Sequence, residues 1–166
     1  MGDFEARDVE VAGNRFVRGL SSVAFATSQG GRAHHNTIYL PQRWAWRILQ
    51  DNSEEPFLPT HDGVVEHNLI VFDENMVSFV NVGGGTAADT FTFHHNAWFN
   101  IDGNRTPNLP VEETDGLYNV DPELSDPGTE HMRIGSDDPR YRHIGADAYE
   151  PDTQAAQRIL PWTVGY

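Results

Sequence analysis

One Asn-centred pattern recurs four times in the first hundred residues and limits the possible folds more than any other feature of this sequence. The anchors are Asn14, Asn36, Asn68 and Asn96, separated by 22, 32 and 28 residues. The residue three before each anchor is apolar, and the residue two after it is large and apolar. A repeat of this kind is typical of stacked architectures, in which each unit buries its apolar face against its neighbours.

Each anchor interrupts an apolar alternation with one polar residue, which is expected at a corner between two strands. Asn suits a corner because its amide can hydrogen-bond to backbone groups that the turn leaves unpaired. Stacked parallel strands lie about 4.8 Å apart. The four amides are then close enough to hydrogen-bond to one another, and we expect an asparagine ladder.

A second strand is expected about ten residues after each of the first three anchors, at residues 22–26, 45–49 and 76–80. Two strands per repeat at a constant offset predict an all-β fold, a parallel β-helix of about four coils over residues 1–116. The longer spacings then represent insertions at turns. A four-stranded antiparallel sheet is the alternative.

Residues 117–166 do not continue the repeat and are rich in Asp, Gly and Pro. We expect them to form an irregular C-terminal cap of the same domain, closing the end of the stack, because a bare last coil would expose an unpaired strand edge. Residues 154–160 are expected to add a short helical turn that Pro161 stops.

Composition excludes several functional classes. The chain carries 25 acidic and 11 basic residues, and its net charge of −14 disfavours nucleic acid and anionic membranes as partners, and polyanionic substrates too unless a local basic patch exists. There is no Cys to form disulfides or thiolate metal sites, and every basic residue is Arg, which excludes a lysine base. No apolar run approaches the roughly 20 residues of a membrane-spanning helix, and residues 1–5 do not begin a signal peptide.

Several motifs together resemble a known family. They are the His-Asn-x-Ile anchors, the glycine turn at 83–85, and the segments 121–124, 136–139 and 144–146. Over roughly residues 5–150 they look like the C-terminal part of right-handed parallel β-helix proteins of the pectate-lyase-like superfamily. The resemblance implies a right-handed coil and an extracellular location. It further implies that the chain binds a polysaccharide, as part of a polysaccharide lyase or hydrolase. It also implies either further N-terminal coils or self-association at the open edge, since coils normally precede these.

The lyases of that superfamily place a cleft along one parallel sheet, where Lys or Arg removes a proton beside a uronate carboxylate and Ca²⁺ often neutralises it. By this resemblance, Arg47 and His61 are the candidate catalytic residues and Trp44 is the candidate substrate-binding residue. The acidic insertion at 51–62 is a candidate cleft wall and Ca²⁺ site. An Arg side chain is a poor base in ordinary surroundings. The alternative is a non-catalytic structural or adhesion module, or the capping end of a larger protein.

The residues just before the anchors form a second candidate site. Stacking places His35, His67 and His95 in one column, with His34, Glu66 and His94 in the neighbouring column. Two imidazoles and a carboxylate are a familiar set of ligands for a divalent metal, so we assign the metal candidates to this second column. The alternative is a column of solvated imidazoles at coil corners that holds no metal.

Overall fold

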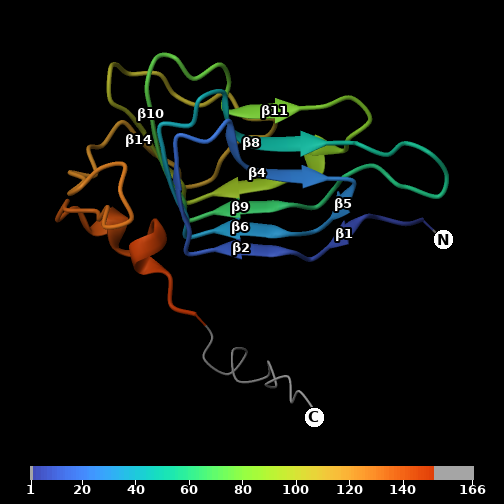
Figure 1. The fold of residues 1–166 in the computed structure, drawn as a ribbon, viewed down its shortest axis with the longest axis horizontal. Coiled ribbons are helices and arrows are strands. Elements are labelled where there is room, and N and C mark those ends of the chain that lie inside the picture. Colours follow the sequence, from blue (N-terminus) through green and yellow to red (C-terminus); the bar gives the residue numbers. More distant parts are fainter. Residues whose placement is uncertain (1, 152–166) are drawn as a thin grey trace, which may run out of the picture.

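The computed structural model describes residues 2–151 and shows an all-β molecule built from parallel sheets (Figure 1). The strands are β1 (Ala6–Arg7), β2 (Glu10–Ala12), β3 (Arg15–Val17), β4 (Ser21–Ala26), β5 (Ser28–Gln29), β6 (Arg32–His34), β7 (Thr37–Tyr39), β8 (Trp44–Leu49), β9 (Val64–Glu66), β10 (Leu69–Phe72), β11 (Val80–Val82), β12 (Thr92–His94), β13 (Ala97–Asn100) and β14 (Leu117–Tyr118). The 3₁₀ helices are η1 (Ala88–Thr90), η2 (Pro139–His143) and η3 (Ala146–Ala148). No helix within 2–151 is long and apolar enough to cross a membrane.

Successive repeats contribute one strand each to the same sheets. Strands preceding the anchors pair in the order β12-β9-β6-β2, strands following them in the order β14-β13-β10-β7-β3, and the second strands in the order β11-β8-β4. A short fourth sheet pairs β1 with β5. Every pair between named strands is parallel, so the antiparallel alternative is wrong.

The observed register matches the sequence repeat. The apolar positions before and after the anchors align across all four repeats, in the rows Val11, Ala33, Val65, Phe93 and Phe16, Ile38, Ile70, Trp98. From the second repeat onward these side chains are buried and meet in one core. The period-two alternation of each strand therefore sends one row of apolar side chains inward in every layer.

The asparagine ladder is confirmed. Each amide Nδ2 donates to the Oδ1 of the next anchor, at 3.0 Å from Asn14 to Asn36, 3.0 Å from Asn36 to Asn68 and 2.9 Å from Asn68 to Asn96. The ladder then ends on a carboxylate, because Asn96 Nδ2 donates to Glu113 Oε1 at 2.7 Å. The last amide therefore has an acceptor without a fifth asparagine.

A fifth layer extends the stack beyond the four predicted coils. Strand β14 continues the sheet by pairing with Ala97 and Trp98 of β13, so the predicted boundary at 116 falls inside this layer. In the loop between β13 and β14, Leu109 and Val111 pack on the core. This loop therefore shields the apolar end of the stack.

The second strand of the third repeat was predicted at 76–80, which is wrong. The strand is β11, at 80–82, and Val80 is the partner of Trp46. Met76 and Phe79 are buried but lie in the incoming turn, where the Phe79 carbonyl accepts the Trp46 N–H at 3.1 Å. Both side chains are apolar because this loop packs on the core, and their spacing resembles the alternation of a strand.

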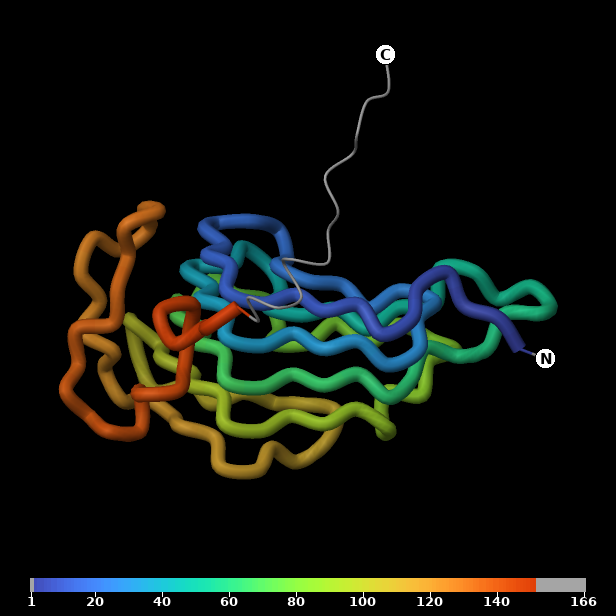
Figure 2. The backbone as a smooth tube through the Cα atoms, turned by 90° about the horizontal axis from the view of Figure 1, so that it is seen from below, coloured from blue at the N-terminus to red at the C-terminus, as the bar shows by residue number. Residues whose placement is uncertain are grey.

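The C-terminal segment lies along the side of the stack rather than only at its end (Figures 1 and 2). Strand β10 is buried on both faces, and its outward residues Leu69 and Val71 pack against Tyr141 and Ile144. The Gly145 N–H also donates to the carbonyl of His67 at 2.8 Å. Residues 119–151 thus run back across the outer face of the sheet formed by β14, β13, β10, β7 and β3. The helical turn predicted at 154–160 lies outside the described residues.

Candidate functional site

The backbone turns sharply at the residue before each anchor. This position has a positive φ in all five layers: 69° at Gly13, 49° at His35, 54° at His67, 55° at His95 and 55° at Asp115. Glycine tolerates such a left-handed conformation, and Asn, Asp and His are enriched among the other residues that adopt it. The corner geometry therefore explains why only small or polar residues occupy this column.

The predicted imidazole column is present. The ring of His67 is stacked between those of His35 and His95, with centroids 5.0 Å away on each side and interplanar angles of 5° and 8°. At the end of the column, His95 Nε2 lies 3.5 Å from Asp115 Oδ2. The stack therefore fixes the plane of the His67 ring between its two neighbours.

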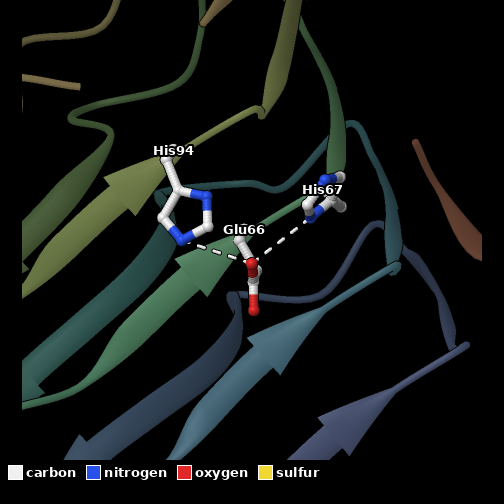
Figure 3. A group of neighbouring side chains, drawn as sticks. All are labelled: Glu66, His67 and His94. Carbon is white, nitrogen blue, oxygen red and sulfur yellow. Dashed lines mark ion pairs between the residues drawn. The ribbon is translucent and has the colours of Figure 1, made fainter. Parts of the chain in front are cut away.

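Glu66, His67 and His94 meet beside this column (Figure 3). Glu66 and His94 end the adjacent strands β9 and β12 and are register partners, while His67 follows Glu66 directly at the corner. Glu66 Oε2 lies 3.2 Å from His94 Nε2 and 3.3 Å from His67 Nδ1. Within residues 2–151 this is the one group of three or more His, Cys, Asp or Glu side chains whose ligand atoms all lie within 4.8 Å of one another.

The Glu66 carboxylate is ionised and held in place from its other side. Its side chain is 8% exposed, and Arg32 Nε donates a hydrogen bond to its Oε1. Burial alone would raise the pKa of Glu66, but the hydrogen bond and charge of Arg32, with His94 and His67, lower it overall. The result is a buried, oriented carboxylate whose Oε2 faces two imidazoles.

Two imidazoles of the column, those of His35 and His67, resist protonation because their pKa values are lowered. Burial, reinforced by the neighbouring His67 and His34, lowers the pKa of His35 to about 4. Burial also lowers the pKa of His67, against the opposing effect of Glu66. Two stacked rings cannot both carry charge without repulsion, so neutral imidazoles are favoured here.

His34 is not part of this group, although the sequence placed it there. It is the register partner of Glu66, but its Nε2 lies 2.7 Å from Glu10 Oε1 and its Nδ1 lies 2.8 Å from His35 Nδ1. The ring of Tyr149 covers it, with centroids 5.8 Å apart. His34 is thereby turned toward the first layer, and the third member of the group is His67, which follows Glu66 in the chain.

Arg47 and Trp44 lie together on β8. The guanidinium carbons of Arg47 and Arg43 lie 4.7 Å and 4.5 Å from the centroid of the Trp44 ring, and Arg47 Nε donates to Asn81 Oδ1 at 3.2 Å. Among the described residues neither guanidinium forms an ion pair. The indole is already in contact with cations, so the guanidinium groups rather than a bare ring are presented to a ligand.

His61 occupies different surroundings from Arg47. Its Nδ1 lies 2.7 Å from Asp62 Oδ2, and its ring packs edge-on against Phe4 at 5.1 Å. Its contacts thus tie the 51–62 insertion to the N-terminal segment. The carboxylates of this insertion do not form a group of ligand atoms within 4.8 Å of one another, so the predicted Ca²⁺ site there is not assembled among the described residues.

No family model, curated protein or solved structure matches this chain. Two constellations of this protein bring functional side chains together: the Glu66 group and the Arg43–Trp44–Arg47 cluster.

Proposed function

We propose that the stacked sheets wind as a right-handed parallel β-helix of the pectate-lyase-like superfamily, and that the protein binds an acidic polysaccharide outside the cell. The observation that carries this proposal is the Arg43–Trp44–Arg47 cluster. A chain of net charge −14 needs a local basic patch to hold a polyanion. Two guanidinium groups that form no ion pair within residues 2–151, placed against one indole, provide such a patch.

The outer face around this cluster suits a carboxylate ligand. Arg47 aligns with Ala24 and Asn81 on the neighbouring strands, so its register row contains no acidic side chain. Guanidinium groups bind carboxylates through paired N–H donors. Contact with the indole already restricts the Arg side chains, so they lose less conformational entropy when a ligand binds. The Nε hydrogen bond to Asn81 supports a binding role for Arg47, and it leaves the terminal nitrogens for a ligand.

The test compares binding of polygalacturonate with that of a neutral galactan by the whole chain. We expect the acidic polymer alone to bind, and Arg47→Ala to weaken binding about tenfold or more, the loss expected for one charged hydrogen-bonded contact. Arg142→Ala is the control, because Arg142 is exposed and this substitution removes the same charge from the C-terminal segment. Equal losses of affinity in both variants would mean that net charge alone explains the weaker binding, and would refute a specific site.

The same samples distinguish a lyase from a binding module. Unsaturated product absorbs in the ultraviolet, and its release by the wild-type chain but not by Arg47→Ala would assign elimination to this sheet face. Binding without product would assign a non-catalytic carbohydrate-binding or adhesion module. The contacts of Arg47 favour the second outcome, because they hold the guanidinium as a hydrogen-bond donor.

A further inference from the structure

We propose that Glu66, His67 and His94 form a binding site for one divalent transition-metal ion of the zinc class, with Glu66 Oε2, His67 Nδ1 and His94 Nε2 as ligand atoms. The site lies at the corner between the two sheets that flank the asparagine ladder. It is separate from the arginine cluster on β8 and does not depend on the carbohydrate proposal.

The separations between these atoms suit a metal. Zinc binds imidazole nitrogen and carboxylate oxygen at about 2.0–2.2 Å in tetrahedral geometry. Two ligand atoms of such a shell are therefore about 3.4 Å apart. Glu66 Oε2 lies 3.2 Å from one imidazole nitrogen and 3.3 Å from the other, and the two nitrogens lie within 4.8 Å of each other. Adjustment of the side chains therefore brings all three atoms into one coordination shell.

The three ligand atoms also lack better partners. Among residues 2–151, the buried His67 Nδ1 has no hydrogen-bond partner, because Glu66 Oε2, 3.3 Å away, is not aligned to accept from it. A buried ring nitrogen without a partner is costly and uncommon. Arg32 occupies the other carboxylate oxygen, Oε1, and leaves Oε2 directed at the imidazoles.

Outer contacts hold the ligands as they do in known metal sites. A ligating histidine usually uses its second nitrogen in a hydrogen bond that fixes the ring. Here the second nitrogen of His94, Nδ1, lies 3.1 Å from His95 Nδ1, and the ring of His67 is fixed by stacking between His35 and His95. The ligand set is thus already arranged before a metal arrives.

The chemistry of the ligands selects the metal. Two imidazoles and one carboxylate favour Zn²⁺, Co²⁺, Ni²⁺ or Cu²⁺ over Ca²⁺, which takes six to eight oxygen ligands. Arg32 places a positive charge beside Glu66, and its side chain is 48% exposed, so solvent screens part of the repulsion. The His94 side chain is 30% exposed, which leaves room for water at the remaining coordination positions. We expect one ion per chain, bound with a dissociation constant on the order of micromolar.

The experiment uses the tag-free chain after removal of metals by a chelator. Co²⁺ is titrated and followed by its visible absorption, and Zn²⁺ or Ca²⁺ is then added to separate samples of the Co²⁺-loaded chain. We expect one equivalent of Co²⁺ to bind, Zn²⁺ to displace it, and Ca²⁺ not to compete. An absorption that fails to saturate near one equivalent, or that Ca²⁺ abolishes as readily as Zn²⁺, overturns the proposal.

Variants locate the site. His67→Asn keeps a residue that tolerates the left-handed corner, and His94→Gln alters a partly exposed side chain, so both retain the fold. Each removes a direct ligand and should weaken Co²⁺ binding by more than the roughly 10–100-fold typical of losing an outer partner. His131→Ala is the control, since His131 is exposed and contacts Glu130 instead. Unchanged binding in both ligand variants, or an equal loss in the control, refutes the site.

Discussion

Removing an interior rung of the asparagine ladder should cost far more stability than removing its first rung. Asn68 is fully buried, and its Oδ1 accepts from both the backbone N–H and the Nδ2 of Asn36, each at 3.0 Å. Its own Nδ2 donates at 2.9 Å to Asn96 Oδ1 and to the carbonyls of Ala33 and Glu66. Asn68→Ala therefore leaves several buried polar groups without partners.

The size of the effect follows from those groups. Each buried donor or acceptor left unsatisfied costs about 1–3 kcal/mol. Asn36 alone loses the acceptor of two donors, and local rearrangement or an entering water recovers part of the loss. We expect Asn68→Ala to lower the free energy of unfolding by about 3–5 kcal/mol. Asn14 is exposed at the first layer, and within the described part of the chain its side-chain amide donates only to Asn36 Oδ1 and the carbonyl of Ala12, so Asn14→Ala should cost no more than about 1 kcal/mol.

Urea denaturation followed by circular dichroism measures both variants, and unchanged m-values show that the same surface is exposed on unfolding. Losses for Asn68→Ala and Asn14→Ala that agree within about 0.5 kcal/mol would refute the reasoning, because burial of the rungs would then carry no cost.

Three further predictions concern other contacts. Glu113→Gln should destabilise by about 1–2 kcal/mol in urea titrations, because an amide cannot accept from both Asn96 Nδ2 and Trp98 Nε1 as the carboxylate does; a neutral effect would mean that water replaces the carboxylate. The lowered pKa of His35 stabilises the fold above pH 6.5, and this contribution should be lost as pH falls from 6.5 toward about 4. It amounts to about 1–2 kcal/mol after allowance for solvent screening, and His35→Asn should flatten that part of the stability profile. Leu69→Ala should cost about 2–5 kcal/mol although Leu69 points outward from its sheet, because the C-terminal segment buries it; a cost below about 1 kcal/mol would mean that this segment is not packed in solution.

The ladder and the register were predictable from sequence because a corner residue in a stacked sheet has few substitutes. The amide of each Asn must donate and accept along the stack while also bonding to backbone groups, and apolar residues at fixed offsets mark the inward rows. The fifth layer was missed because it does not use this solution. Gly116 takes the anchor position, and Glu113 reaches back from the preceding loop to accept from Asn96. The sequence signal for this layer was the run Asp115, Gly116, Leu117 and Tyr118, a corner residue and anchor position followed by a short strand.

The position of the C-terminal segment also had a signal in the sequence. Leu69, Ile70, Val71 and Phe72 are four consecutive apolar residues, which indicates a strand buried on both faces rather than one exposed to solvent. Such a strand needs a covering layer, and residues 119–151 provide it. The choice of His67 over His34 in the histidine group had no comparable signal, because it depends on side-chain contacts: His34 meets Glu10 in the first layer and Tyr149, 115 residues further along the chain.

The corner backbone requires a residue that tolerates a positive φ, but it does not require histidine. Gly13 and Asp115 meet the same requirement in the first and last layers. Burial lowers the pKa of His35 and of His67, neighbouring imidazoles lower both further, and the fold therefore loses stability in acid. His67→Asn separates the two demands, since Asn fits the corner and lacks the ring nitrogen that faces Glu66. We expect the free energy of unfolding of this variant to lie within about 1 kcal/mol of the wild-type value when both are free of metal. Zn²⁺ at a hundred times its dissociation constant should stabilise the wild type by about 2.7 kcal/mol and leave the variant unchanged. Equal stabilisation of both by Zn²⁺ would place the metal elsewhere and leave the imidazole column as an element of the fold.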